Sequence, residues 1–101
     1  FILNDVSKVR NISVSHIKSK TRMRHIKDAR HIVIIASWKY TDEGNYPIGF
    51  QVNRDHASVI HARKQYYRDN KLHEMADDYM SKFAGIRPKR EIYENFELTN
   101  R

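Results

Sequence analysis

The sequence contains no cysteine, only three glycines and two prolines, and no long apolar run. The absence of cysteine excludes disulfide frameworks and thiolate metal sites, and it fits a reducing compartment. So few glycines leave no glycine-rich loop for binding phosphate. A membrane-spanning helix needs roughly 18 apolar residues in succession, so no such span is expected. With 101 residues, 40% of them hydrophobic, the chain suits one small folded domain.

The chain begins at Phe1, and its start lacks a basic segment followed by an apolar one. We therefore expect no signal peptide. Because the first residue is not methionine, we expect the chain to be a piece of a longer protein.

Positive charge is concentrated in the first 40 residues. They contain nine Lys and Arg against two Asp, whereas the other 61 residues have no net charge. Most of the surplus lies between His16 and Lys39. So local a surplus predicts a contact surface for a polyanion, with nucleic acid the first candidate and an acidic membrane the second.

The spacing of apolar residues predicts helices in the first half of the chain. A short helix is expected within residues 1–11, and a second one follows Ser13 as its N-cap. Residues 18–25 have no apolar face and predict an exposed basic loop. From Ile26 to Tyr40 apolar residues recur every three or four positions. The run 32–35 also fits a buried strand, but about fifteen residues without Gly or Pro favour a helix.

The second half of the chain predicts a helix-turn-helix. A turn at residues 41–45 precedes a very short helix opened by Pro47, and the next helix is expected from about Arg54 to Asp69. A last helix is expected over residues 72–84. We divide the chain into a domain, 1–85, and a C-terminal extension, 86–101. The extension fits a docked segment and a loose tail equally well.

The helix expected over residues 54–69 has two contrasting sides. The inward side should hold Val59, Ile60, Ala62, Tyr66 and Tyr67, and the outward side Ala57, Ser58, His61, Lys64, Gln65 and Arg68. Hydroxyl, imidazole, amide and cationic groups beside a methyl are those that contact bases and phosphates. Periodicity places His56 nearer the apolar side, as a partly buried histidine. Trp38 and the Tyr66-Tyr67 pair are expected in the core.

Residues 53–62 read Asn-Arg-Asp-His-Ala-Ser-Val-Ile-His-Ala. This segment resembles the Gly-Arg-Asp-His-Thr-Thr-Val-Leu-His-Ala motif of the DNA-binding C-terminal domain of the bacterial replication initiator DnaA. The resemblance covers about Ile12 to Arg68. It also rests on Ile12-Ser13-Val14, the basic loop Ser19-Lys20-Thr21-Arg22-Met23-Arg24, Ala29-Arg30-His31 and Ile48-Gly49.

The resemblance implies an all-α, Trp repressor-like bundle of about five to six helices that binds the short, asymmetric DnaA box in double-stranded DNA. It places Asp55, His56 and Ala57 against bases in the major groove and Arg22 in the adjacent minor groove. Carboxylate acceptors suit cytosine, and arginine suits a narrow minor groove. The residues expected on the phosphate backbone are Lys20, Arg30, His31, Ser58 and His61, to which we add Arg24 and Lys64.

The chain departs from the family pattern at several positions. Ala57 stands where the family usually has Thr, so a methyl is kept and a hydroxyl is lost. Val52-Asn53 replaces a Phe-Gly-Gly-like approach to the second helix, and Trp38 stands where a basic residue is common. The family's ATPase module is absent from this chain, so nothing predicts nucleotide hydrolysis.

Neither a metal site nor catalysis is expected. His56 and His61 are five residues apart and do not share a helix face, so no zinc site is predicted. Asp55, His56 and Ser58 point in different directions and cannot converge as a catalytic triad. We predict no cofactor.

The function predicted from the sequence is binding of double-stranded DNA as a monomer, in replication initiation or its control, in the cytoplasm at the nucleoid. One alternative is a protein-interaction module whose basic loop and extension grip an acidic partner. Another is a transcriptional regulator that uses the same fold. The apolar residues of the extension fit packing within the chain at least as well as docking on a partner protein: Ile92, Tyr93, Phe96 and Leu98.

Overall fold

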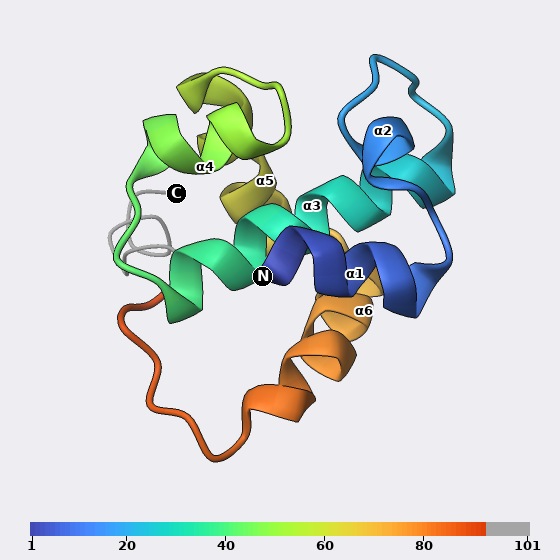
Figure 1. The fold of residues 1–101 in the computed structure, drawn as a ribbon. Helices are drawn as coiled ribbons and strands as arrows, with labels where there is room; N and C mark the ends of the chain where they lie inside the picture. The colour runs from blue at the N-terminus through green and yellow to red at the C-terminus, as the bar shows by residue number, and fades with distance from the viewer. Residues whose placement is uncertain (93–101) are drawn as a thin grey trace.

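The computed structural model describes residues 1–92, and within that range the backbone is helical and without strands. This confirms the all-α prediction. Residues 1–92 form six α-helices and one 3-10 turn, and Figure 1 shows how the helices are arranged. In chain order they are α1 (Ile2–Arg10), α2 (Val14–Ile17), α3 (Arg24–Tyr40), α4 (Asn45–Gln51), α5 (His56–Arg68), α6 (Asn70–Met80) and η1 (Ser81–Phe83).

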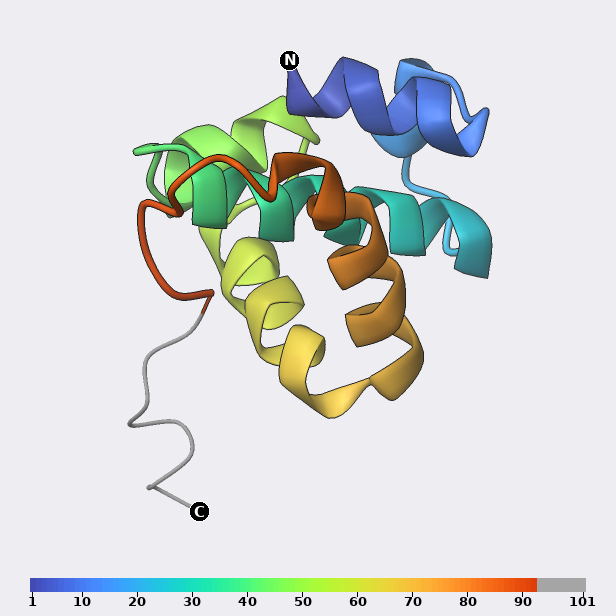
Figure 2. The same cartoon turned by 90° about the horizontal axis from the view of Figure 1, so that it is seen from below.

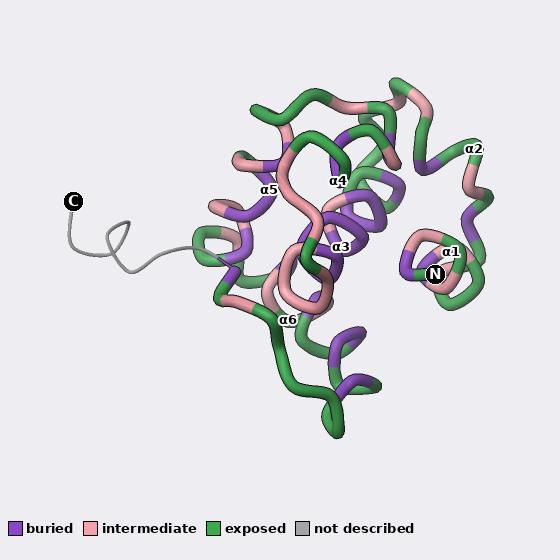
Figure 3. The backbone as a smooth tube through the Cα atoms, turned by 60° about the vertical axis from the view of Figure 1, so that its left-hand side comes forward, coloured by how far each residue is buried: buried purple, intermediate pink, exposed green. Residues whose placement is uncertain are grey.

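Helix α3 is the centre of the molecule, and it contacts each of the other five α-helices. Figure 3 shows its buried backbone surrounded by the more exposed outer segments. The residues 32–35 are fully buried in this helix, so the alternative of a strand there is wrong. The reason for the ambiguous pattern is that helices cover α3 on several sides. A segment buried on several sides reads as a continuous apolar run rather than as one stripe.

Side-chain caps fix where several helices begin. Ser13 accepts a hydrogen bond from the His16 N–H at 3.0 Å and starts α2, as predicted. Asp69 accepts from the Lys71 and Leu72 N–H groups, both at 3.1 Å. The last helix therefore begins two residues earlier than the sequence indicated, and its final turn tightens into η1.

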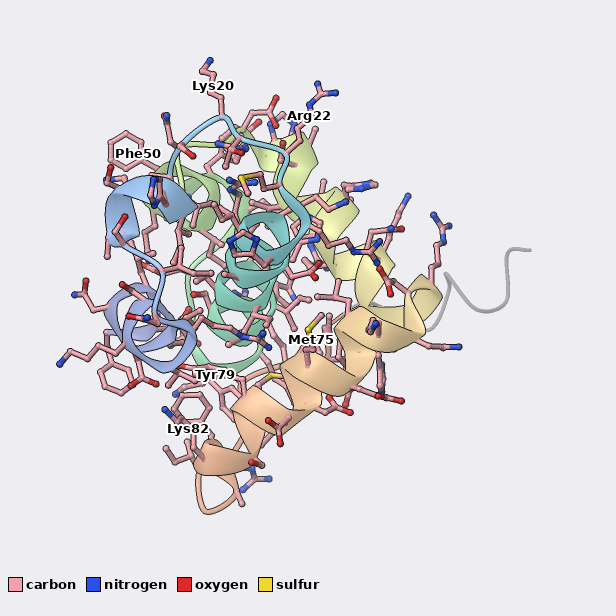
Figure 4. All side chains as sticks on the ribbon, turned by 90° about the vertical axis from the view of Figure 1, so that its right-hand side faces the viewer. Lys20, Arg22, Phe50, Met75, Tyr79 and Lys82 are labelled. Carbon is pink, nitrogen blue, oxygen red and sulfur yellow. The ribbon has the colours of Figure 1, made fainter. Side chains whose placement is uncertain are left out.

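The two ends of the described chain are tied to the helical body. In α1, Asp5 accepts a hydrogen bond from the Tyr79 hydroxyl at 2.7 Å and pairs with Lys82. Figure 4 shows Tyr79 and Lys82 on the α6 side of the molecule, at the opposite end from Lys20 and Arg22. Residues 86–92 return across α3, as Figure 2 shows, and Ile92 is buried.

The division into a domain of residues 1–85 and an extension of residues 86–101 stays a prediction. Of the four apolar extension residues, Ile92 packs into the core of this chain, and Tyr93, Phe96 and Leu98 lie outside the described residues. Across residues 1–92, no helix combines the length and the apolar character that crossing a membrane requires.

Candidate functional site

An open groove of about 690 Å³ lies between the basic loop and the start of α5. Eight of the eleven predicted site residues line it: Lys20, Arg22, Arg30, His31, Asp55, Ala57, Ser58 and His61. Five further residues line it that the sequence reasoning missed: Thr21, Lys27, Ile34, Asn53 and Arg54. Its charged side chains are five cations and one carboxylate, so the groove attracts anions.

The turn between α4 and α5 sets one wall of the groove. A Cβ atom on Gly49 would lie 2.6 Å from the carbonyl oxygen of Arg54, so only glycine permits this close approach. The Gly49 carbonyl accepts hydrogen bonds from the N–H groups of Val52 and Arg54 at 3.0 and 2.8 Å. Asn53 adopts a left-handed conformation with φ of 60°. Asparagine tolerates that region, which explains how this turn forms without the expected glycines.

Asp55 is the N-cap of α5, and its carboxylate accepts a hydrogen bond from the Ser58 N–H at 2.9 Å. This bond lowers the pKa of Asp55, so the carboxylate stays ionised at neutral pH. Asp55, His56 and Ala57 are all exposed at the start of the helix. The first turn of α5 therefore presents an acceptor, an imidazole and a methyl group to the surroundings.

The periodicity-based expectation that His56 is partly buried is wrong. His56 is the first residue of α5 and is exposed, because the α4 side chain beside it, Tyr46, is itself 70% exposed. Its ring stacks on that of Tyr46, with centroids 4.5 Å apart and an interplanar angle of 22°. Tyr46 belongs to α4, so this contact joins the two helices of the helix-turn-helix at their exposed surface. His56 does not line the groove.

The basic loop is held in shape by hydrogen bonds between its small hydroxyl side chains and nearby main-chain groups. Ser19 Oγ donates to the His16 carbonyl at 2.6 Å, and the Met23 N–H donates to Thr21 Oγ1 at 3.2 Å. The side chains of Lys20 and Arg22 project outward from this loop, as Figure 4 shows. Their charges are therefore available to a ligand at the groove.

Arg30 lies beneath this loop and is only 5% exposed. Its Nε donates to the Ile17 carbonyl at 2.7 Å, and its Nη2 donates to the carbonyls of Ser19 and Thr21 at 3.0 and 3.4 Å. Arg54 also donates to the Ser19 carbonyl, at 2.7 Å. Burial and the neighbouring Arg54 lower the pKa of Arg30. The guanidinium that the resemblance assigns to a phosphate is thus engaged with the loop.

Two histidines face each other at the groove. The rings of His31 on α3 and His61 on α5 meet edge to face, with centroids 6.1 Å apart. Burial, and then the His61 ring, lower the pKa of His31 to about 4, so His31 is neutral at neutral pH. Its neutral ring acts as a hydrogen-bonding group rather than as a cation.

The remaining predicted residues lie outside the groove. Arg24 pairs with Asp28 at 3.8 Å and with Asp69 at 3.5 Å, so it links the start of α3 to the start of α6. Lys64 is half-buried on α5. The predicted inward side of α5 is correct for Val59, Ala62 and Tyr66, but Tyr67 is 39% exposed and Arg63 is buried instead.

Two of the missed groove residues belong to sequence patterns described above. Arg54 is part of the matched motif, and Lys27 is one of the nine cations in the first 40 residues. Their place at the groove depends on how α3 and α5 cross, which no local pattern specifies. Across residues 1–92, no group of three or more His, Asp or Glu side chains is arranged to hold a metal ion.

The chain is similar to known proteins over its first two thirds. A family model described as "Bacterial dnaA protein helix-turn-helix" matches residues 1–65. The chromosomal replication initiator protein DnaA of Flavobacterium psychrophilum is 37% identical over 65 residues, which are 63% of this chain and 14% of that protein. Its counterpart in Bacteroides thetaiotaomicron is 41% identical over 64 residues, 62% of this chain and 14% of that protein. The chain thus spans a small part of the length of these relatives.

Proposed function

The chain belongs to the family of bacterial DnaA helix-turn-helix domains, and we propose that it binds double-stranded DNA sequence-specifically at sites resembling the DnaA box. It does so as a monomer, in replication initiation or its control, at the nucleoid. The observation that carries this proposal is the groove that joins the basic loop to the start of α5. Two walls of different chemistry suit the two grooves of one duplex.

The first turn of α5 enters the major groove in this proposal. A major groove about 12 Å wide admits an α-helix, and residues near its N-terminus reach the base edges. Asp55 accepts from the amino group of cytosine, and the Ala57 methyl contacts that of thymine. His56 supplies a further base contact, with its ring already oriented by Tyr46.

The basic loop enters the adjacent minor groove. Arg22 projects from it, and a guanidinium is favoured where the minor groove is narrow and electronegative. The phosphate backbone between the two grooves of the duplex then lies along the protein groove. Contacts to it are proposed for Lys20, His31, Ser58 and His61, with Arg24 and Lys64 at the margins. Arg30 is proposed to support the phosphate contacts indirectly, because its guanidinium holds the basic loop in place.

Selection of bound duplexes from a random-sequence pool tests the proposal. The unaltered chain should enrich one asymmetric motif. Asp55→Asn keeps a good N-cap for α5 but replaces an anionic acceptor by an amide, so preference at one base pair should fall about tenfold. Lys20→Ala is the control, since losing a phosphate contact weakens all sequences about equally.

The outcomes separate the candidate functions. A pool that shows no enriched motif would contradict sequence-specific binding and would favour an interaction module with an acidic protein partner. Equal effects of Asp55→Asn and Lys20→Ala on every duplex would contradict the division between the residues that read bases and those that hold phosphates.

A further inference from the structure

Residues 86–92, which we call the strap, are fastened to the end of α3. The Lys89 N–H donates to the Lys39 carbonyl at 2.7 Å, and Arg90 Nε donates to the Trp38 carbonyl at 2.6 Å. In the reverse direction, Trp38 Nε1 donates to the Glu91 carbonyl at 2.8 Å. Arg90 also donates to the Glu43 carbonyl, just before α4. Main-chain and side-chain bonds thus hold the strap at successive residues.

Trp38 is the anchor of this arrangement. The guanidinium carbons of Arg63 and Arg90 each lie 3.5 Å from the centroid of its ring system. A planar cation over the face of an indole is a favourable contact, and here Arg63 comes from α5 and Arg90 from the strap. The indole therefore connects the second helix of the helix-turn-helix to the strap.

Arg63 extends the connection to α4. It is only 6% exposed, its Nε donates to the Ile92 carbonyl at 2.7 Å, and its Nη1 donates to Asn45 Oδ1 at 2.9 Å. Asn45 is the first residue of α4. One side chain on α5 thus contacts α3, α4 and the strap together. None of these contacts involves a residue that lines the groove.

We propose that the strap is an integral part of the DNA-binding domain and that Trp38, Arg63 and Arg90 are positioning residues that set α5 against α4. The proposal rests on the proposed function and goes beyond it, because the family match ends at residue 65 and the strap lies after it. If α5 shifts by a small angle, its first turn, which is proposed to contact bases, moves relative to the basic loop. Release of the strap therefore lowers DNA affinity although no DNA contact is removed.

The chain offers a matched pair of variants to test this. Arg90→Gln removes the stacked guanidinium, whereas Arg87→Gln removes the same charge from an exposed position of the same strap. Trp38 is the single tryptophan, so its fluorescence reports directly on docking. Arg90→Gln should raise acrylamide quenching of Trp38 severalfold. It should also weaken binding to the selected duplex about tenfold, with an unchanged dependence on salt, since no phosphate contact is lost.

Arg87→Gln should leave quenching unchanged and DNA affinity within about twofold of the unaltered chain. Each variant loses one positive charge outside the groove, so the weak long-range effect of that charge on affinity is the same in both. A second variant, Lys89→Pro, removes the N–H that bonds to the Lys39 carbonyl and lies outside every helix. It should reproduce the effect of Arg90→Gln with the helix content intact by circular dichroism.

Three results would overturn the proposal. In the first, increased quenching shows that the strap is released in Arg90→Gln and Lys89→Pro, but both variants bind DNA as tightly as Arg87→Gln does. The second is unchanged quenching in both variants, which means that these contacts do not hold the strap. The third is an unaltered chain that binds no duplex, which defeats the proposed function itself; quenching of Trp38 then still shows whether the strap is docked.

Discussion

Arg30 and Arg63 are two buried arginines that hold two different non-helical segments against the helical body. Each donates its Nε to a main-chain carbonyl at 2.7 Å, Arg30 to Ile17 and Arg63 to Ile92. Their exposed fractions are nearly the same, at 5% and 6%. Arg30 supports the basic loop at the groove, whereas Arg63 supports the strap.

The two sites differ in how the guanidinium is satisfied. Arg30 bonds to the carbonyl of Ile17 at the end of α2 and to two carbonyls of the loop, one of which also accepts from Arg54. Arg63 is stacked on Trp38 and also bonds to the side chain of Asn45. The loop is therefore held by two arginines that share one of its carbonyls, but the strap is held through a shared aromatic ring. The lesson is that some cations in a basic chain are internal cross-links, not part of the charge offered to a ligand.

Removing each arginine gives the largest expected effect. Arg30→Met and Arg63→Met should each lower the free energy of unfolding by about 2–3 kcal/mol, since charged hydrogen bonds are lost and buried carbonyls are left without donors. Urea denaturation followed by circular dichroism measures this. Quenching of Trp38 should increase in Arg63→Met alone.

The contrary result is equally clear. If Arg30→Met is as stable as the unaltered chain, water satisfies the loop carbonyls and Arg30 is not a cross-link. If both variants raise the quenching of Trp38 equally, loop and strap are one cooperative unit, and the comparison between them fails.

Much of the fold follows from the sequence. Periodicity, the Ser13 cap and the turn residues predicted each helix within a few positions, because these signals are local. The strand alternative for residues 32–35 arose because α3 is buried on several sides. The helix was correctly favoured because the segment is about fifteen residues long and contains no Gly or Pro. The exposure of His56 was missed because periodicity does not show how far α4 covers the first turn of α5, where only the exposed ring of Tyr46 is recorded against the His56 ring.

The site was partly predictable, and the strap was not. The motif and the basic loop identified six groove residues, since both are continuous in sequence, and the matched segment 29–31 identified Arg30 and His31. Burial of Arg30 and Arg63 leaves no local pattern, because each arginine bonds to carbonyls 9 to 29 residues away in the chain. The sequence around a buried arginine does not differ recognisably from that around an exposed one, so the two are distinguished only when the acceptors are known.

Acidification should lower the free energy of unfolding through the loop side of the molecule and not through the strap side, by less than the arginine substitutions do. His31 lies on the loop side, and its folded-state pKa of about 4 is below the unfolded value of about 6.5. Stability from the neutral ring is therefore fully present above pH 6.5 and is lost as the pH falls toward 4. Between pH 7.5 and pH 5 we expect His31 to account for a loss of about 1–2 kcal/mol.

Urea titrations at several pH values measure this loss. His31→Gln should flatten the dependence between pH 7.5 and pH 5, whereas Arg63→Met should keep it, because no strap anchor titrates in that range. A dependence that persists in His31→Gln would place the titrating group elsewhere and would remove this difference between the loop side and the strap side.

The dependence of DNA affinity on salt gives the smallest effect and the sharpest test of the comparison. Each phosphate contact contributes about 0.9 to the slope of log K against log salt. Lys20→Ala should reduce the magnitude of the slope by about 1, because Lys20 projects from the loop. Arg30→Met should lower affinity without changing the slope, since its guanidinium bonds to carbonyls. Fluorescence anisotropy from 50 to 200 mM salt, about the range over which such contacts are resolved, provides the slopes. Were Arg30→Met to change the slope as Lys20→Ala does, Arg30 would contact phosphate, as the family resemblance implies, and only Arg63 would remain an internal cross-link.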